Sequence, residues 1–124
     1  MDALYTDDER LLAQTMRDFA EAELGPLAAG WDEREEFPWA SLDALKRMDL
    51  MGLTMPTEFG GSGASYAEMN IVAEEIARGC GSTSVILVAH LSLCTEFIAT
   101  FGTPAQKQQW VPTLASAETI GAFA

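Results

Sequence analysis

Apolar residues recur at every third or fourth position along most of the chain, which is the spacing of one face of an α-helix. The first periodic stretch follows Thr6, and Thr6 and Glu9 have the spacing of a capping box. We expect Gly25-Pro26 to stop or kink this first helix, because proline lacks the backbone N–H that a helix interior needs. The charged residues 31–37 then predict a solvated connection or a short helical turn.

A second helix and a long loop come next. Pro38 suits the first turn of the second helix, and Gly52 suits its C-terminal cap. Residues 53–64 contain several glycines and a proline between polar residues, so this segment predicts a loop.

Two further helices follow the loop. Ser65 and Glu68 form a second capping box, and the third helix should end near Gly79 or Gly81. The fourth helix should start at Ser82 or Thr83 and run to about Phe101. It is apolar on nearly every face, which is typical of a helix at the centre of a larger body.

The fifth helix has three agreeing start signals, namely a Thr cap, a proline in the first turn and a Gln at the capping-box position: Thr103, Pro104 and Gln106. Trp110 and Leu114 are expected to face inward, and Pro112 to kink or shorten the helix.

The pattern changes after Glu118. Residues 119–124 are small and β-compatible, so they predict the start of a strand for which the chain supplies no partner. The expected fold class is therefore all-α, a bundle of about five helices over residues 1–118. Residues 119–124 would be the first strand of a sheet domain beyond this stretch.

Composition and charge narrow the possible functions. The 124 residues carry a formal net charge of −12, so binding to nucleic acid or to an anionic membrane surface is not expected. The apolar run of residues 85–101 is too short and too polar for a confident membrane span. The acidic N-terminus resembles neither a signal peptide nor a transit peptide.

Cysteine and histidine are scarce. Cys80, Cys94 and the single His90 exclude a disulfide scaffold and a Cys/His zinc site, so no metal site is expected. Two thiols suit a reducing compartment, and we expect a cytoplasmic protein.

Two sets of acidic residues are candidates for chemistry. Glu74 and Glu75 are adjacent in the third helix, so at most one faces inward, and a solvated pair is the simpler interpretation. Glu96 stands alone in the apolar fourth helix. It is either a buried functional carboxylate, or a residue on the wet side of the helix, or the partner of Lys46, Arg47 or Arg78.

Two other candidates have simpler structural interpretations. His90 is expected to be a hydrogen-bonded histidine of the core or of a pocket, and Cys94 a small buried thiol on the same face rather than a nucleophile. The glycines of residues 60–63 lack the spacing of a phosphate-binding loop and predict a tight turn with positive φ.

The order of several motifs resembles the N-terminal domain of the acyl-CoA dehydrogenase family. These are the Pro-Thr-Glu-Phe-Gly-Gly loop at residues 56–61, the acidic Glu-Glu-Ile-Ala at 74–77, and two stretches at 101–107 and 110–114. The resemblance covers essentially the whole chain. Ala117 departs from it, because relatives usually have Gly in that turn.

The resemblance implies a larger FAD enzyme that oxidises an acyl-CoA thioester at its α and β carbons. A glutamate outside this stretch would be the base, so the chain should contain no catalytic residue and should be inactive alone. Electron-transfer flavoprotein would be the acceptor and a homotetramer the assembly. Phe123 and Ala124 match the first positions of the flavin-binding stretch. The acyl pocket would include five residues of the fourth helix: Ser84, Leu87, Val88, Leu91 and Ser92.

Two classes of alternative remain open. An acyl-CoA oxidase or a flavin monooxygenase of the same fold would share these motifs. A non-catalytic helical module, acting alone or as a subunit of a larger flavoprotein, would share them too.

Overall fold

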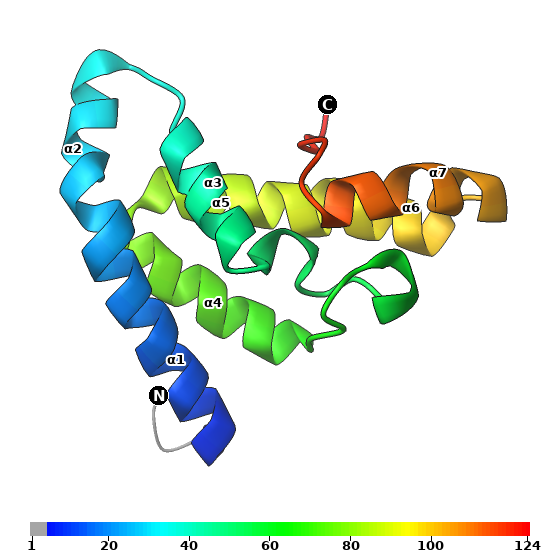
Figure 1. Ribbon diagram of the computed structural model, residues 1–124, viewed down its shortest axis with the longest axis horizontal. Helices are drawn as coiled ribbons and strands as arrows, with labels where there is room; N and C mark the ends of the chain where they lie inside the picture. Colours follow the sequence, from blue (N-terminus) through cyan, green and yellow to red (C-terminus); the bar gives the residue numbers. More distant parts are fainter. Residues whose placement is uncertain (1–4) are drawn as a thin grey trace.

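The computed structural model describes residues 5–124, and these form five continuous helices with no strand among them (Figure 1). The all-α prediction is confirmed. The first helix joins α1 (Asp7–Phe19), the π-helical turn η2 (Ala20–Leu24) and α2 (Gly25–Arg34). The others are α3 (Trp39–Arg47), α4 (Tyr66–Gly79), the central helix Gly81–Phe101 and α7 (Pro104–Ala115).

The central helix contains three segments, α5 (Gly81–Val88), the π-helical η5 (Ala89–Thr95) and α6 (Glu96–Phe101). Two 3₁₀ turns lie in the loop between α3 and α4: η3 (Leu50–Gly52) and η4 (Thr57–Phe59).

All three predicted capping boxes are present. Thr6 accepts a hydrogen bond from the N–H of Glu9, Ser65 from that of Glu68, and Thr103 from that of Gln106. In each box the longer side chain reaches back to the N–H of the cap residue. Each pair therefore satisfies backbone donors that the start of a helix leaves without partners.

The first helix does not stop at Gly25-Pro26. The N–H of Gly25 donates to the carbonyl of Ala20, one residue further back than in an α-helix, and the helix continues to Arg34. A π-helical turn just before a proline accommodates the missing N–H and the bulk of the ring. The expected connection at residues 31–37 is thus helical as far as Arg34.

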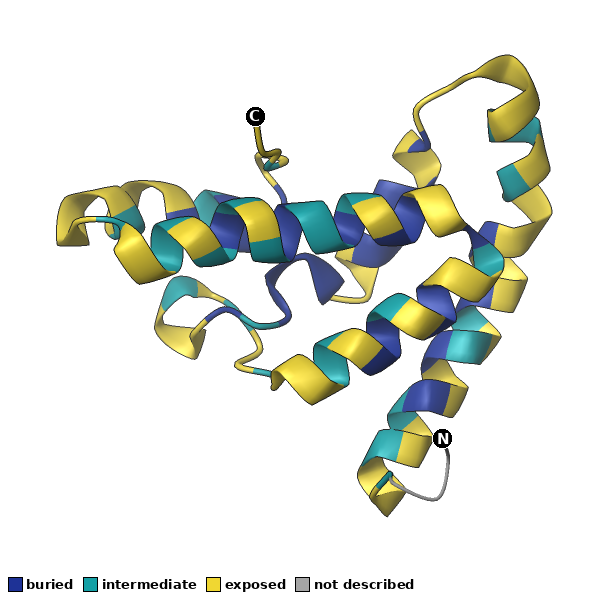
Figure 2. Ribbon diagram, turned by 180° about the vertical axis from the view of Figure 1, so that it is seen from behind, coloured by how far each residue is buried: buried dark blue, intermediate teal, exposed yellow. Residues whose placement is uncertain are grey.

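α4 packs between the first helix and the central helix, with α1 along one side and α5 along the other (Figure 1). The inner faces of these helices are buried and their outer faces exposed (Figure 2). The largest fully buried apolar side chains come from these helices, from α3 and α7 and from the α3–α4 loop: Leu24, Leu45, Met51, Met55, Val72, Ile76, Leu87, Leu91 and Val111.

Two details of packing differ from the sequence predictions. Gly52 does not cap α3, which ends at Arg47. A Cβ at position 52 would lie 2.9 Å from the carbonyl oxygen of Ala115, so glycine is needed there for close approach to α7. Trp110 was predicted to face inward, but it is 44% exposed, and the buried face of α7 is instead formed by Val111, Leu114 and Ala115. Pro112 lies inside α7 without ending it.

The central helix is 21 residues long, and among the described residues it is the one helix long and apolar enough to cross a membrane. Length and composition alone are weak evidence, because core helices of soluble proteins meet the same criterion.

The predicted strand at residues 119–124 is not formed. α7 is followed by a turn, and residues 120–124 have no regular structure. A strand needs a neighbour with which to pair its backbone, and the described residues supply none. Residues 1–4, at the start of the acidic N-terminal stretch, lie outside the described residues.

Candidate functional site

The five predicted pocket residues of the central helix fall into two groups that differ in burial. Ser84, Leu87 and Leu91 are buried, and Leu87 and Leu91 belong to the main hydrophobic core. The Ser84 hydroxyl donates a 2.7 Å hydrogen bond to the carbonyl of Ala73 on α4. These three side chains thus pack or form hydrogen bonds within the helical domain.

Val88 and Ser92 of the same helix are half-buried. The Ser92 hydroxyl is 3.5 Å from the sulfur of Met69. The sequence analysis did not single out Val85, which is 69% exposed and lies one turn before Val88. The i, i+3 spacing of Val85 and Val88 could have identified Val85 as a residue on the same side of the helix as Val88. We call the partly or fully exposed side chains of Val85, Val88 and Ser92 the outer face of the central helix.

A broad groove of about 750 Å³ begins at this outer face. Its lining includes Val85, Ile86, Phe37 and Pro38, together with the acidic residues 35 and 36, but neither Val88 nor Ser92. Apolar side chains form most of this surface, so an apolar group fits it better than an anion.

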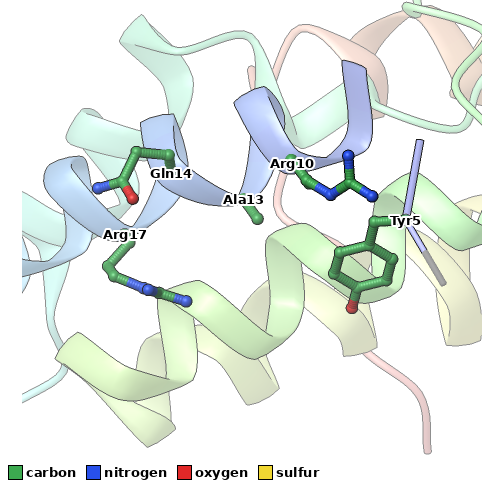
Figure 3. Close-up of a pocket in the computed structure, with 5 residues that line it drawn as sticks. All are labelled: Tyr5, Arg10, Ala13, Gln14 and Arg17. Carbon is green, nitrogen blue, oxygen red and sulfur yellow. The ribbon is translucent and has the colours of Figure 1, made fainter. Parts of the chain in front are cut away.

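A second pocket of about 210 Å³ lies beside α1 (Figure 3). Tyr5, Arg10 and Arg17 line it, but both guanidinium groups have carboxylate partners, Asp7 for Arg10 and Glu75 for Arg17. These cations therefore already serve internal ion pairs.

Glu96 is not a buried acid. It is half-buried, its carboxylate accepts a 3.3 Å hydrogen bond from Thr100, and it adjoins Tyr66. Hydrogen bonding to this carboxylate, followed by its negative charge, raises the pKa of the Tyr66 phenol. Of the predicted alternatives, the wet side of the helix is the correct one.

None of the three expected cations pairs with Glu96. Lys46 binds the carbonyl of Ala117, Arg47 binds Glu23, and Arg78 binds Glu74 and Glu75.

His90 is fully buried and hydrogen-bonded, as predicted. Its Nε2 lies 3.1 Å from the carbonyl oxygens of both Met51 and Leu114, and its Nδ1 accepts a 2.9 Å bond from the N–H of Gly121. Burial lowers the pKa of His90, and the hydrogen bonds to the two carbonyls partly oppose that effect. Cys94 was predicted to be a buried thiol, but it is only half-buried.

The glycine loop is a tight turn, as predicted. Gly60 and Gly63 have φ of 84° and 66°, in the left-handed region. The N–H groups of residues 60–63 all donate to backbone carbonyls of residues 52–57. They are therefore not free to bind a phosphate.

The C-terminal residues leave an aromatic ring and backbone donors accessible. Phe123 is 65% exposed, and the N–H groups of residues 122–124 make no hydrogen bond within the described part of the chain. An exposed aromatic ring beside unpaired backbone donors suits a planar ring system with a polar edge.

Comparison with known proteins finds matches over nearly the whole chain. The family model described as "Acyl-CoA dehydrogenase, N-terminal domain" matches residues 6–118. The chain is 44% identical over 118 residues to the mitochondrial short-chain specific acyl-CoA dehydrogenase of Bos taurus, covering 95% of this chain and 29% of that protein. It is 41% identical over 123 residues to the short-chain specific acyl-CoA dehydrogenase of Clostridium acetobutylicum, covering 99% and 32%.

Solved structures share the fold. A glutaryl-coenzyme A dehydrogenase in complex with glutaryl-CoA aligns with a TM-score of 0.85 at 34% identity, covering 98% of this chain and 31% of that one. A chain in the structure of the electron transferring flavoprotein of Acidaminococcus fermentans aligns with a TM-score of 0.87 at 28% identity, covering 98% and 32%. The chain thus spans about a third of the length of the proteins that it resembles.

Proposed function

Because the chain belongs to the acyl-CoA dehydrogenase family, we propose that it is the N-terminal helical domain of an FAD-dependent enzyme that oxidises acyl-CoA thioesters between the α and β carbons. The match of residues 6–118 to the family's N-terminal domain carries this proposal. The structure supports it with an apolar outer face on the central helix and exposed residues at the C-terminal end.

In the proposed reaction, the outer face of the central helix binds the apolar part of the acyl group. Val85 and Val88 supply apolar surface, which excludes water from the acyl chain. FAD, when bound, accepts the hydride from the β carbon. Phe123 and Ala124 would contact the flavin through the aromatic ring and the unpaired N–H groups.

The catalytic base belongs, in this proposal, to a part of the enzyme beyond these residues. Glu96 is the one carboxylate of the central helix, and its oxygen already accepts from Thr100. A base must be within hydrogen-bond reach of the proton that it removes. Residues 5–124 alone are therefore expected to turn over no acyl-CoA, even with added FAD.

The relatives suggest further properties. The names of the bovine and clostridial proteins favour a short acyl chain, and the likeness to a chain of the A. fermentans structure favours an electron-transferring flavoprotein as acceptor. We also propose a homotetramer and a cytoplasmic location for the whole enzyme.

The acyl-site proposal is tested by placing a larger side chain on the outer face, which reduces the space for the acyl chain. In the gene product that contains these residues, Val88→Phe should reduce kcat/KM for hexanoyl-CoA more than for butyryl-CoA, because the larger ring shortens the space for the acyl chain. A tenfold fall in the ratio of kcat/KM for hexanoyl-CoA to that for butyryl-CoA corresponds to about 1.4 kcal/mol of differential transition-state stabilisation.

Leu11→Phe is the matched control. Leu11 is also exposed and apolar, but it lies on α1. It should leave the ratio unchanged. An unchanged ratio in Val88→Phe as well would remove the outer face from the acyl site.

A further inference from the structure

One buried side chain joins three separate parts of the chain. His90 lies in η5, and its ring contacts Met51 in η3, Leu114 near the end of α7 and Gly121 in the C-terminal segment. A buried polar group needs hydrogen-bond partners, and those of His90 come from three segments that are distant in the sequence.

The contacts fix the tautomer of the ring. A backbone N–H only donates, so Nδ1 of His90 is the acceptor in the 2.9 Å bond from Gly121. Nε2 then carries the proton and lies 3.1 Å from each of two carbonyl oxygens, which only accept. Both nitrogens of the neutral imidazole therefore have hydrogen-bond partners.

The position of Gly121 depends on a second contact. A Cβ at residue 121 would lie 2.6 Å from the sulfur of Cys94, which is closer than such atoms approach. Glycine lets the backbone come close to the central helix, where His90 accepts its N–H.

The path from α7 to Gly121 is held at two earlier points. Lys46 donates a 3.0 Å bond to the carbonyl of Ala117, and the N–H of Thr119 donates a 3.1 Å bond to the carbonyl of Thr113. After Gly121 the backbone N–H groups have no partner in the described part of the chain. The bond to His90 is thus the last one that fixes the chain before Phe123.

We propose that His90 is a positioning residue, which sets through Gly121 the place where Phe123 and Ala124 are presented to the flavin. The identity of the presented group rests on the proposed function. The positioning itself rests on the hydrogen bonds of His90 and on the close contact of Gly121 with Cys94.

Two substitutions separate positioning from filling of the core. In His90→Asn, the amide oxygen takes about the place of Nδ1 and still accepts from Gly121, but the side chain does not reach the two carbonyls. In His90→Gln, the amide nitrogen reaches about the place of Nε2 and donates to those carbonyls, but Gly121 loses its acceptor. Both variants disturb the core, and only the second releases Gly121.

The first measurement is amide hydrogen exchange, resolved to single residues, of the gene product that contains these residues, with the amide of Ile76 as a reference for global stability. Relative to Ile76, protection of Gly121 should fall by about tenfold or more in His90→Gln and stay within about threefold of wild type in His90→Asn. Equal protection of Gly121 in wild type and His90→Gln would overturn the proposal.

A measurement on the unsubstituted gene product covers the case in which a variant does not fold. The ¹⁵N shifts of the imidazole should show a protonated Nε2 and an unprotonated Nδ1 at neutral pH. A protonated Nδ1 would overturn the proposal, because the bond from Gly121 would then be impossible.

The link to the flavin is tested in the flavin-bound gene product. His90→Gln should shift the visible absorbance of the flavin, and His90→Asn should leave it close to wild type. Loss of Gly121 protection with an unchanged flavin spectrum would overturn the positioning role. Absence of flavin from the gene product would instead contradict the proposed function, since the exchange and tautomer measurements use no cofactor.

Discussion

The guanidinium of Arg17 on α1 holds the carboxylate of Glu75 on α4 with two hydrogen bonds, 2.9 Å from Nε and 2.8 Å from Nη2. The Glu75 side chain is only 5% exposed, and Arg78 adds a third contact at 2.9 Å. Two cations therefore compensate one buried anion, and the bidentate geometry fixes α1 against α4.

Glu75→Gln should destabilise the chain by about 2 kcal/mol, because it removes the charge that Arg17 and Arg78 neutralise. The effect is smaller than for a fully buried pair, since Arg17 is 37% exposed and regains water. Urea denaturation followed by circular dichroism measures the change.

Glu74→Gln is the matched control one residue away. Glu74 is exposed and lies 3.5 Å from Arg78, so its loss should change the free energy of unfolding by less than about 0.5 kcal/mol. Equal effects of the two substitutions would contradict a structural role for the buried ion pair.

The same carboxylate makes stability depend on pH. The hydrogen bond from Arg17 lowers the pKa of Glu75, burial opposes this, and the charges of Arg17 and Arg78 lower it further. The folded pKa thus lies below the unfolded value of about 4.3. Stability from Glu75 is complete above that value and is lost as pH falls through the folded pKa.

The difference in unfolding free energy between wild type and Glu75→Gln should therefore be constant near neutral pH and shrink below about pH 4. Glu9 and Glu68 also have lowered pKa values, from hydrogen bonds at their helix caps. Wild type and Glu75→Gln both contain these two glutamates, so their contribution cancels in the difference. Denaturation midpoints measured from pH 7 to pH 3 give the comparison. A difference that stays constant to pH 3 would show that Glu75 titrates normally.

Ala117 lies in the left-handed region with φ of 55°, at the turn after α7. The resemblance to the family had marked this position, where relatives usually have Gly. Ala117→Gly should stabilise the chain by up to about 1 kcal/mol, because glycine adopts this conformation without the steric cost of a Cβ.

Ala29→Gly provides the opposite control, since Ala29 is exposed in the interior of α2. It should destabilise the chain by about 1 kcal/mol. Thermal unfolding should therefore show a higher Tm than wild type for Ala117→Gly and a lower Tm for Ala29→Gly. A decrease in Tm for Ala117→Gly would mean that the buried methyl group contributes more than the backbone conformation costs.

Local chemistry explains which features could be predicted from the sequence. A capping box joins residues three positions apart, so Ser65 and Glu68 identify a helix start without knowledge of the fold. The positive φ of Gly60 follows equally from its immediate neighbours. The resemblance to the family added the fold, because the order of several weak motifs is far more specific than each motif alone.

Features that depend on distant partners could not be predicted. Arg17 and Glu75 are 58 residues apart, so the sequence favoured a solvated pair of glutamates at residues 74 and 75, and this interpretation is wrong for Glu75, which is buried. Trp110 has helical spacing from Leu114, but Val111 takes the inner position against the domain. The π-helical turns change which side chains of the first and central helices face outward, and no local signal placed η5.

The central claim is tested most directly by the flavin of the purified gene product that contains residues 1–124. We predict that it binds FAD, and that butyryl-CoA added without oxygen bleaches the flavin absorbance and yields the α,β-unsaturated thioester. Return of the colour with electron-transferring flavoprotein, rather than with oxygen and peroxide formation, would identify a dehydrogenase and not an oxidase. A flavin that is absent, or that no acyl-CoA of any chain length reduces, would contradict the account.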